Sequence, residues 1–174
     1  MCDGEGSPTS VSQALGMLDR ALDHLNGADV ASLPSGVQAE ALRALERAQA
    51  KHTAARGRVL GAFAAQGGFE DDGHGTARTW LKWQTQITAG AAAGAVGWVR
   101  RLAAHPVIAG ALAAGELSRS WARQICAWTD RLPEAQRGDA DQILAAAAGG
   151  GASLAELGGL AREIVRAVPA GRVR

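Results

Sequence analysis

The 174-residue sequence lacks the long apolar run that a membrane-spanning helix requires, about 20 residues. Its N-terminus also lacks the basic segment followed by an apolar segment that is typical of a secretory signal peptide. Only two cysteines are present, Cys2 and Cys126, and their spacing fits neither a metal site nor a disulfide framework. These absences argue against a membrane protein and favour a protein of the reducing cytoplasm.

The sequence motifs of several enzyme classes are missing too. There is no GxxxxGK[ST] phosphate loop, no GxSxG nucleophile elbow, no HExxH zinc motif and no CxxC pair. Asn26 is the only asparagine, and it falls at the end of a predicted helix, so a His-Asn-His nuclease site lacks its residues. We therefore expect that the chain itself is not an enzyme and that it holds no metal or cofactor.

One acidic segment comes closest to a catalytic cluster. Glu70, Asp71, Asp72 and His74 lie within five residues of one another, and carboxylates with an imidazole can bind a divalent cation. The glycines around them leave these side chains without fixed positions, which favours a solvated loop. A metal-dependent hydrolase using these four residues remains an alternative, and metal analysis of the purified protein would test it.

The apolar residues recur at helical spacing along most of the chain, and no stretch alternates as a β-strand does. Serine, threonine and proline at the start of these segments predict helix caps. We predict a single all-α domain over residues 10–168, built as a bundle of about seven helices. Residues 1–9 are expected to form a disordered tail, and residues 169–174 a basic C-terminal tail.

The longest predicted helix covers residues 36–66, which corresponds to roughly 45 Å. Its inner stripe, with alternating spacings of three and four, is only partly apolar: Leu42, Leu45, Gln49, His52, Arg56, Val59 and Phe63. A long helix of this kind usually packs against a partner helix or a second chain. A protein-interaction or dimerisation bundle, with this helix as its contact surface and no nucleic-acid contact, is therefore the alternative function.

Charge is distributed unevenly along the chain although the net charge is +1. Residues 1–50 carry seven acidic and three basic residues, whereas residues 51–174 carry ten acidic and fifteen basic residues. Residues 73–131 have a balance of +5 and contain all five tryptophans. Such a basic, tryptophan-bearing segment is compatible with nucleic-acid binding. Solvated arginines around core tryptophans are the alternative interpretation.

Helix–turn–helix spacing occurs twice in this basic segment, at residues 76–104 and 107–131. In the first unit, the second helix carries Gly90, Gly94 and Gly97, which we expect to serve tight helix–helix packing, and Trp80, Trp83 and Trp98 are expected to be core. In the second unit, the helix after Ser118 is the better candidate for reading DNA. The candidate base-edge or phosphate contacts are Arg119, Arg123 and Gln124, and the candidate backbone contacts are Arg78, Lys82, Arg100 and Arg101.

Three isolated side chains have simpler interpretations. His52 lies on a helix stripe and is expected to be packed or interfacial. His105 lies near a helix end, where an imidazole interacts favourably with the helix dipole. Cys126 has no His or Asp at helical spacing to activate it, so it is expected to be a small core residue.

The middle of the sequence resembles the actinobacterial 13E12 repeat family, also described as domain of unknown function 222. The matching features are Gly73-His74, Trp80-Leu81, Ile87-Thr88, His105-Pro106, the run ALAAGELS at residues 111–118, and Leu132-Pro133. With the Ala/Leu-rich helices on either side, the likeness covers about residues 10 to 168. The block from Pro106 through ALAAGELS is its most specific part.

The resemblance implies a function. Domains of this family typically lie N-terminal to an HNH endonuclease domain, in proteins linked to mobile elements. The implied role is to position or regulate the nuclease on double-stranded DNA, with an HNH domain as partner. The present chain ends at Arg174 before any HNH motif, so we expect a truncated product or a stand-alone domain.

Overall fold

The computed structural model describes residues 10–168, and the chain divides into two compact units, residues 1–42 and 43–174. Within the described part there are eight α-helices, one 3-10 turn and no β-strand, which confirms the predicted all-α class. None of these helices is both long enough and apolar enough to cross a membrane. The tails predicted at residues 1–9 and 169–174 lie outside the described residues.

The first unit contains α1 (Val11–Gly27), a 3-10 turn (Val30–Ser32) and the beginning of α2 (Ser35–Ala65). Ser10 caps α1 as its spacing predicts, because its hydroxyl accepts a hydrogen bond from the Gln13 backbone N–H at 3.2 Å.

The turn before α2 is held by a side chain of α2 itself. The amide of Gln38 donates to the carbonyl oxygens of Val30 and Leu33, at 2.9 and 3.1 Å. No described residue of this unit is buried. The apolar stripe of α1 is therefore exposed, at Val11, Leu15, Leu18, Leu22 and Leu25.

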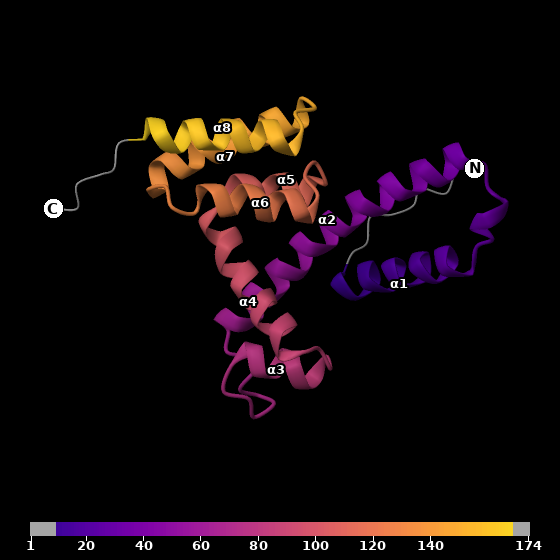
Figure 1. Cartoon of the computed structure of the whole chain (residues 1–174). Helices are drawn as coiled ribbons and strands as arrows, with labels where there is room; N and C mark the ends of the chain where they lie inside the picture. The colour runs from indigo at the N-terminus through magenta and orange to yellow at the C-terminus, as the bar shows by residue number, and fades with distance from the viewer. Residues whose placement is uncertain (1–9, 169–174) are drawn as a thin grey trace. The chain divides into compact units, whose positions relative to one another are not determined.

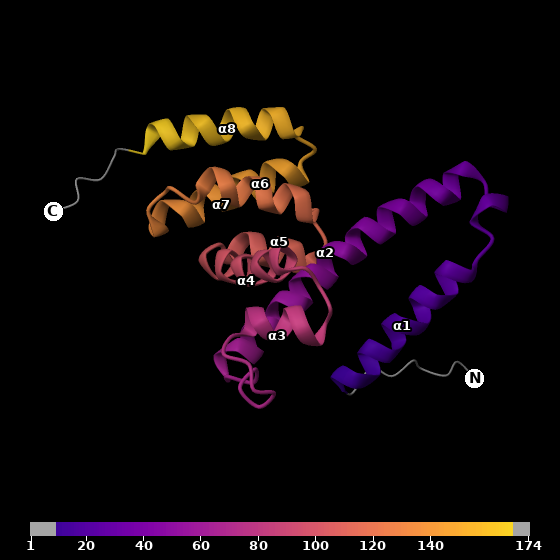
Figure 2. The same ribbon diagram turned by 60° about the horizontal axis from the view of Figure 1, so that its bottom comes forward.

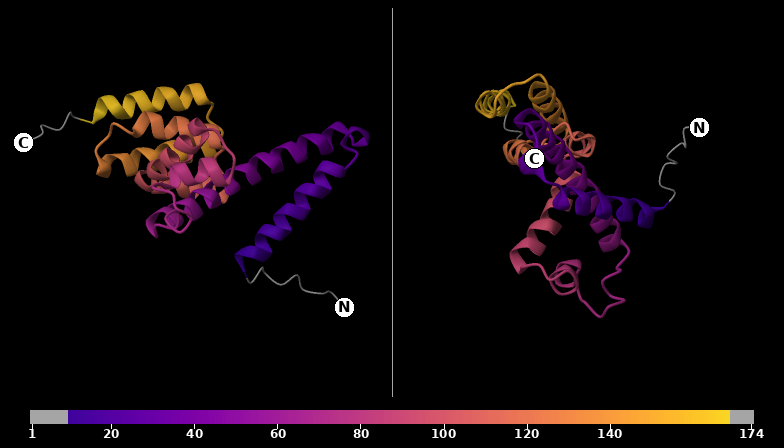
Figure 3. Two further views of the ribbon diagram at one scale, coloured as in Figure 1. Left: turned by 90° about the horizontal axis from the view of Figure 1, so that it is seen from below. Right: turned by 90° about the vertical axis from the view of Figure 1, so that its right-hand side faces the viewer.

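The second unit contains the rest of α2 and six further helices, which are α3 (Ala77–Gln84), α4 (Ala89–Ala104), α5 (Pro106–Ala114), α6 (Arg119–Thr129), α7 (Glu134–Gly149) and α8 (Leu154–Ala167). The last four lie against one another as a small bundle (Figure 1 and Figure 2). Helices α7 and α8 stay adjacent in the two further views of Figure 3. Helix α3 packs against α4 instead.

Four helix starts follow the predicted capping chemistry. Thr76, Thr88, Ser118 and Ser153 each accept a hydrogen bond from the backbone N–H three residues further on. At Ser153 the box is complete, because the Glu156 carboxylate accepts from the Ser153 backbone N–H at 2.7 Å. The helix boundaries of this unit thus arise from short polar residues at fixed spacing before each apolar run.

The larger of two apolar cores lies among α5, α6, α7 and α8, and Ala50 and Ala54 of α2 also join it. Its fully buried large side chains are Ile108, Leu112, Ile125, Leu144 and Leu157. Cys126 belongs to this core, as predicted, and burial raises the pKa of its thiol to about 12. An unreactive thiol is the consequence, since the thiolate is the nucleophilic form.

The smaller core joins α2, α3 and α4 through Leu60, Ala77, Leu81 and Ala92. The half-buried side chains of Phe63 and Trp80 cover it, with ring centroids 4.5 Å apart. Trp80 also donates its indole N–H to the Asp72 carboxylate at 2.6 Å. This hydrogen bond ties Asp72, a residue of the acidic segment, to α3.

One tryptophan departs from the predicted core. Trp80 and Trp98 are half-buried and pack against the two cores, but Trp83 is 62% exposed. The prediction for Trp83 is wrong because α3 is short and buries only one face, which carries Ala77 and Leu81. Trp83 lies on the other side of the helix, where Lys82 Nζ is 4.6 Å from its ring centroid.

The glycines of α4 also differ from their prediction. A Cβ atom added at Gly90, Gly94 or Gly97 would meet nothing within 4 Å, and all three residues are exposed. Close approach to α4 occurs instead on α2, where a Cβ at Gly61 would lie 3.3 Å from Val99 Cγ1. The three α4 glycines therefore cost helix stability, about 1 kcal/mol each relative to alanine, without serving contacts among the described residues.

Candidate nucleic-acid interface

Two predicted contact residues come together on α6. Arg119 and Arg123 are four residues apart, so they share one face of the helix, and both are exposed. They line a groove of about 500 Å³ together with His52 and Arg56 of α2. We call this the arginine groove; its other lining residues are Thr53, Gly57, Leu60, Ile87, Gly90, Ala91, Gly94, Ala95 and Trp98.

The charged side chains that line the arginine groove are all basic. No Asp or Glu lines it, and among the described residues no carboxylate lies within ion-pair distance of Arg56, Arg119 or Arg123. The Arg123 guanidinium lies 5.9 Å from the ring centroid of Trp98, which orients it over the groove wall. Three guanidinium groups on one concave surface repel one another, so the groove favours an anion that neutralises them.

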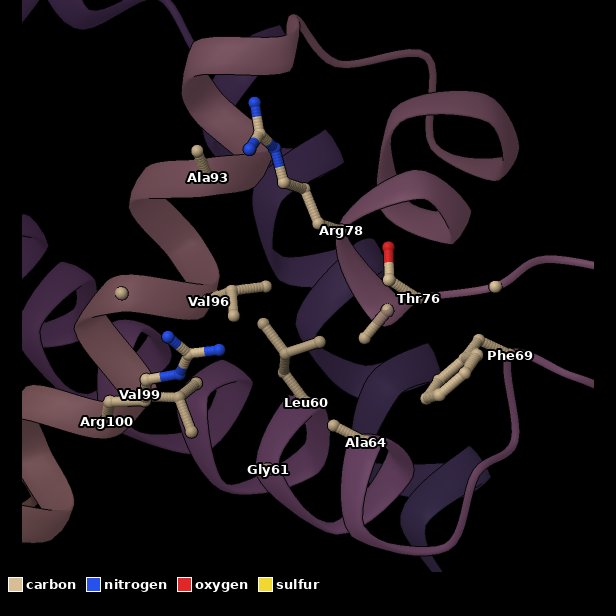
Figure 4. A pocket seen from close by; sticks show the side chains of 13 residues that line it. Leu60, Gly61, Ala64, Phe69, Thr76, Arg78, Ala93, Val96, Val99 and Arg100 are labelled. Carbon is tan, nitrogen blue, oxygen red and sulfur yellow. The ribbon is translucent and has the colours of Figure 1, made fainter.

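A second pocket opens on the other side of α4 (Figure 4). It also measures about 500 Å³, and two of its lining residues are the predicted contacts Arg78, from α3, and Arg100, from α4. Figure 4 shows Arg78 and Arg100 on their separate helices, with Val96 between them. The floor is apolar and includes Leu60, so this α3–α4 pocket has basic groups only where Arg78 and Arg100 lie.

Arg101 is held elsewhere. Its guanidinium forms an ion pair with Asp130, with Nη2 3.0 Å from Oδ2, and it lines neither the arginine groove nor the α3–α4 pocket. The remaining oxygen of Asp130 lies 2.9 Å from His105 Nε2. Arg101 is thus part of an internal polar network.

That network has its centre at His105, which is 0% exposed. The Nδ1 atom of His105 lies 2.8 Å from the carboxylate of Asp141, which is also 0% exposed, and the hydroxyl of Thr129 is 2.7 Å from the same carboxylate. The imidazole can donate to both aspartates only when each ring nitrogen carries a proton. His105 therefore links the α4–α5 junction to α6 and α7, and it lies at the C-terminal end of α4, as predicted.

The other two predicted contacts are separate from both cavities. Lys82 lies over the exposed ring of Trp83 on α3. Gln124 is half-buried, and because it directly follows Arg123 it points about 100° around α6 from the Arg119–Arg123 face. The structure therefore assembles Arg119 with Arg123 and Arg78 with Arg100, and it leaves Lys82, Arg101 and Gln124 outside these pairs.

The acidic segment does not form a metal site. Among residues 10–168 no group of three or more His, Cys, Asp or Glu side chains is close enough to hold an ion. Asp72 of this segment is engaged by the indole of Trp80. The structure thus gives the metal-dependent hydrolase alternative no assembled ligand set.

Two basic residues of the arginine groove are absent from the sequence-based candidates. His52 and Arg56 lie on the partly apolar stripe of α2, and both are exposed. The sequence does mark these two residues as unusual, because they are polar residues at positions of the α2 stripe where the spacing of three and four favours apolar side chains. The sequence could not show that α6, more than sixty residues further along, brings its arginines to the same place.

Comparisons of the chain with protein-family models, with curated proteins and with solved structures find no match.

Proposed function

We propose that this chain is a non-catalytic helical module that binds double-stranded DNA, mainly through electrostatic contacts with phosphates. The observation that carries the proposal is the arginine groove, which Arg56, Arg119 and Arg123 line together and which no Asp or Glu of residues 10–168 lines. Arginine suits this task because its planar guanidinium donates several hydrogen bonds to phosphate oxygens and stays charged at all relevant pH values.

The groove favours phosphate contacts over the reading of bases. Base recognition needs side chains such as Asn, Gln or Arg held at base edges, and the uncharged lining of the groove consists mostly of small or apolar residues. Contacts of this type position a protein on nucleic acid without selecting a sequence. The binding we propose is therefore weak, dependent on salt and largely independent of sequence.

The resemblance to the 13E12 repeat family supplies a biological setting for such binding. In that setting the module would position or regulate an HNH endonuclease domain on DNA. Cutting of the DNA would belong to the HNH domain, and this chain would contribute affinity for the duplex.

The experiment is duplex binding measured by fluorescence anisotropy across a salt series. The double variant Arg119→Gln/Arg123→Gln removes two of the groove cations, so the slope of log affinity against log salt should become shallower by roughly 2. A matched control is Arg162→Gln/Arg166→Gln, since these exposed arginines have the same four-residue spacing on α8. Equal slopes for the two double variants, or no duplex binding by the wild type at low salt, would remove the proposal.

A second candidate function is self-association through α2. Leu45 and Val59, both on the predicted stripe of this helix, are exposed. Phe63, at the end of the stripe, packs instead against Trp80 and Phe69 and so serves the smaller core. Light scattering of the wild type and of Leu45→Glu and Val59→Glu tests this function: a wild-type dimer that the variants dissociate supports it, and a wild-type monomer excludes it.

A further inference from the structure

We infer that α4 lies in the major groove of the duplex, with the arginines on its two sides contacting the phosphates of opposite strands. This inference rests on the proposed function and adds the element that enters the duplex and the way in which both strands are held. It starts from the observation that basic side chains line two separate cavities, and that α4 forms a wall of both.

The two cavities use different faces of α4. The α4 residues that line the α3–α4 pocket are Ala93, Val96, Gly97, Val99 and Arg100, whereas those that line the arginine groove are Gly90, Ala91, Gly94, Ala95 and Trp98. Apart from Val99, the residues within each set recur at intervals of three and four, so each set follows its own side of the helix. Arg78 and Arg100 consequently flank one side of α4, and Arg56, Arg119 and Arg123 flank the other.

Over the first turns of α4, the exposed ridge between these two sides carries almost no side-chain bulk, and Arg101 follows on the same ridge one turn after Gly97. Gly90, Gly94 and Gly97 form this ridge, and nothing among the described residues comes within 4 Å of the place where their Cβ atoms would be. The major groove of B-DNA is about 12 Å wide, close to the diameter of an α-helix with its side chains. A helix with a glycine ridge enters such a groove deeply, which brings the arginines on both sides toward the two phosphate backbones.

This geometry sets the class of ligand. A duplex presents two phosphate backbones at a fixed separation, and a single strand presents only one, so two-sided contact selects the duplex. The ridge has no hydrogen-bonding side chain at Gly90, Gly94 or Gly97 with which to read a base edge. The inferred ligand is therefore double-stranded DNA of any sequence.

The first test adds bulk to the ridge without removing charge. Gly94→Leu and Gly97→Leu should each keep the fold, because the space around both Cβ positions is open, and each should weaken duplex binding at least tenfold. The matched control is Gly110→Leu on α5, where the residue is likewise exposed and the Cβ position likewise open, and it should bind as the wild type does. Circular dichroism of each variant verifies the helix content.

The second test removes charge from the side of α4 away from α6. Arg78→Gln/Arg100→Gln should make the salt slope shallower by roughly 2, as Arg119→Gln/Arg123→Gln does. An equal-length single strand should compete poorly with the duplex.

The outcomes separate this inference from the proposed function. If the Arg119/Arg123 variant weakens binding but both leucine variants and the Arg78/Arg100 variant bind as the wild type does, the arginine groove binds DNA without α4 in the major groove. The inference is then overturned and the proposed function stands. A single strand that competes as well as the duplex also overturns it. Absence of any duplex binding by the wild type at low salt overturns both.

Discussion

The bundle of α5 to α8 and the region around α4 use the same small residues for opposite purposes. In the bundle, Gly158 of α8 is buried, and a Cβ there would lie 3.3 Å from the Trp128 ring, so the glycine makes room for a neighbour. On α4, a Cβ added at Gly90, Gly94 or Gly97 would meet nothing within 4 Å, and these glycines line the same cavities as arginines that form no ion pair with another described residue. In the bundle, glycine therefore serves close packing, whereas on α4 it lowers helix stability at an exposed surface.

The largest expected effect is on the polar network inside the bundle. Asp141→Ala leaves the buried imidazole of His105 without its Nδ1 partner and the buried Thr129 hydroxyl without its carboxylate, and each buried polar group left unsatisfied typically costs about 1–3 kcal/mol, more if it is charged. Urea unfolding followed by circular dichroism measures the loss. Asp130, on the exposed side of the same imidazole, is the comparison: Asp130→Ala should cost clearly less, and equal losses would show that burial does not govern the network.

The next effect compares the two apolar cores directly. Leu144→Ala, at a fully buried position of the larger core, should lower the free energy of unfolding by about 2–5 kcal/mol through lost burial and the remaining cavity. Leu81→Ala in the smaller core should lie at the lower end of that range, because its surroundings are partly open to solvent. Urea unfolding of both variants shows which substitution lowers the free energy of unfolding more. A larger loss for Leu81→Ala would contradict the expectation that the larger core contributes more to stability.

A smaller effect, which should differ between the two regions, is expected for replacing glycine by alanine. Gly97→Ala should stabilise the protein by roughly 0.5–1 kcal/mol, because alanine restricts the unfolded chain and its methyl group meets no neighbour. Gly158→Ala should give no such gain, since its methyl group would press on Trp128. Thermal unfolding of both variants checks this prediction, and stabilisation of similar size at both positions would remove the contrast.

The smallest effect concerns the cap of α8. Hydrogen bonds from the backbone N–H and then the hydroxyl of Ser153 lower the pKa of Glu156 below its ordinary value of 4.5. A lowered folded-state pKa contributes stability above the unfolded-state pKa, and that stability is lost as the pH falls through the folded-state value. Glu156→Gln should therefore be slightly less stable than the wild type at pH 7 and indistinguishable from it near pH 2. A difference that persists at pH 2 would exclude the carboxylate as its cause.

Much of the fold could be predicted from local sequence patterns. The caps at Thr76, Thr88, Ser118 and Ser153 and the length of α2 follow from residue type and short-range spacing, which act within one turn of helix. Which faces become buried depends on tertiary packing. For this reason the exposure of Trp83 and of the α4 glycines could not be read from α3 and α4 alone.

Tertiary packing also limits how much of the candidate site could be predicted from the sequence. Arg119 and Arg123 could be paired from their four-residue spacing, and Arg100 and Arg101 could be recognised as basic. Arg100 lines a cavity, whereas Arg101 forms an ion pair with Asp130 at the end of α6. The sequence around Arg100 and Arg101 does not show this difference, because Asp130 is far away along the chain. The roles of Arg56 and His105 likewise arise from partners far away in the sequence.

The most direct test of the central claim is the salt dependence of the wild-type chain binding to a duplex of about 30 base pairs. The arginine groove and the α3–α4 pocket together present five arginines, Arg56, Arg78, Arg100, Arg119 and Arg123. If each of them neutralises one phosphate, the slope of log affinity against log salt should be roughly −4 to −5. A slope near zero, or no binding at low salt, would contradict the account.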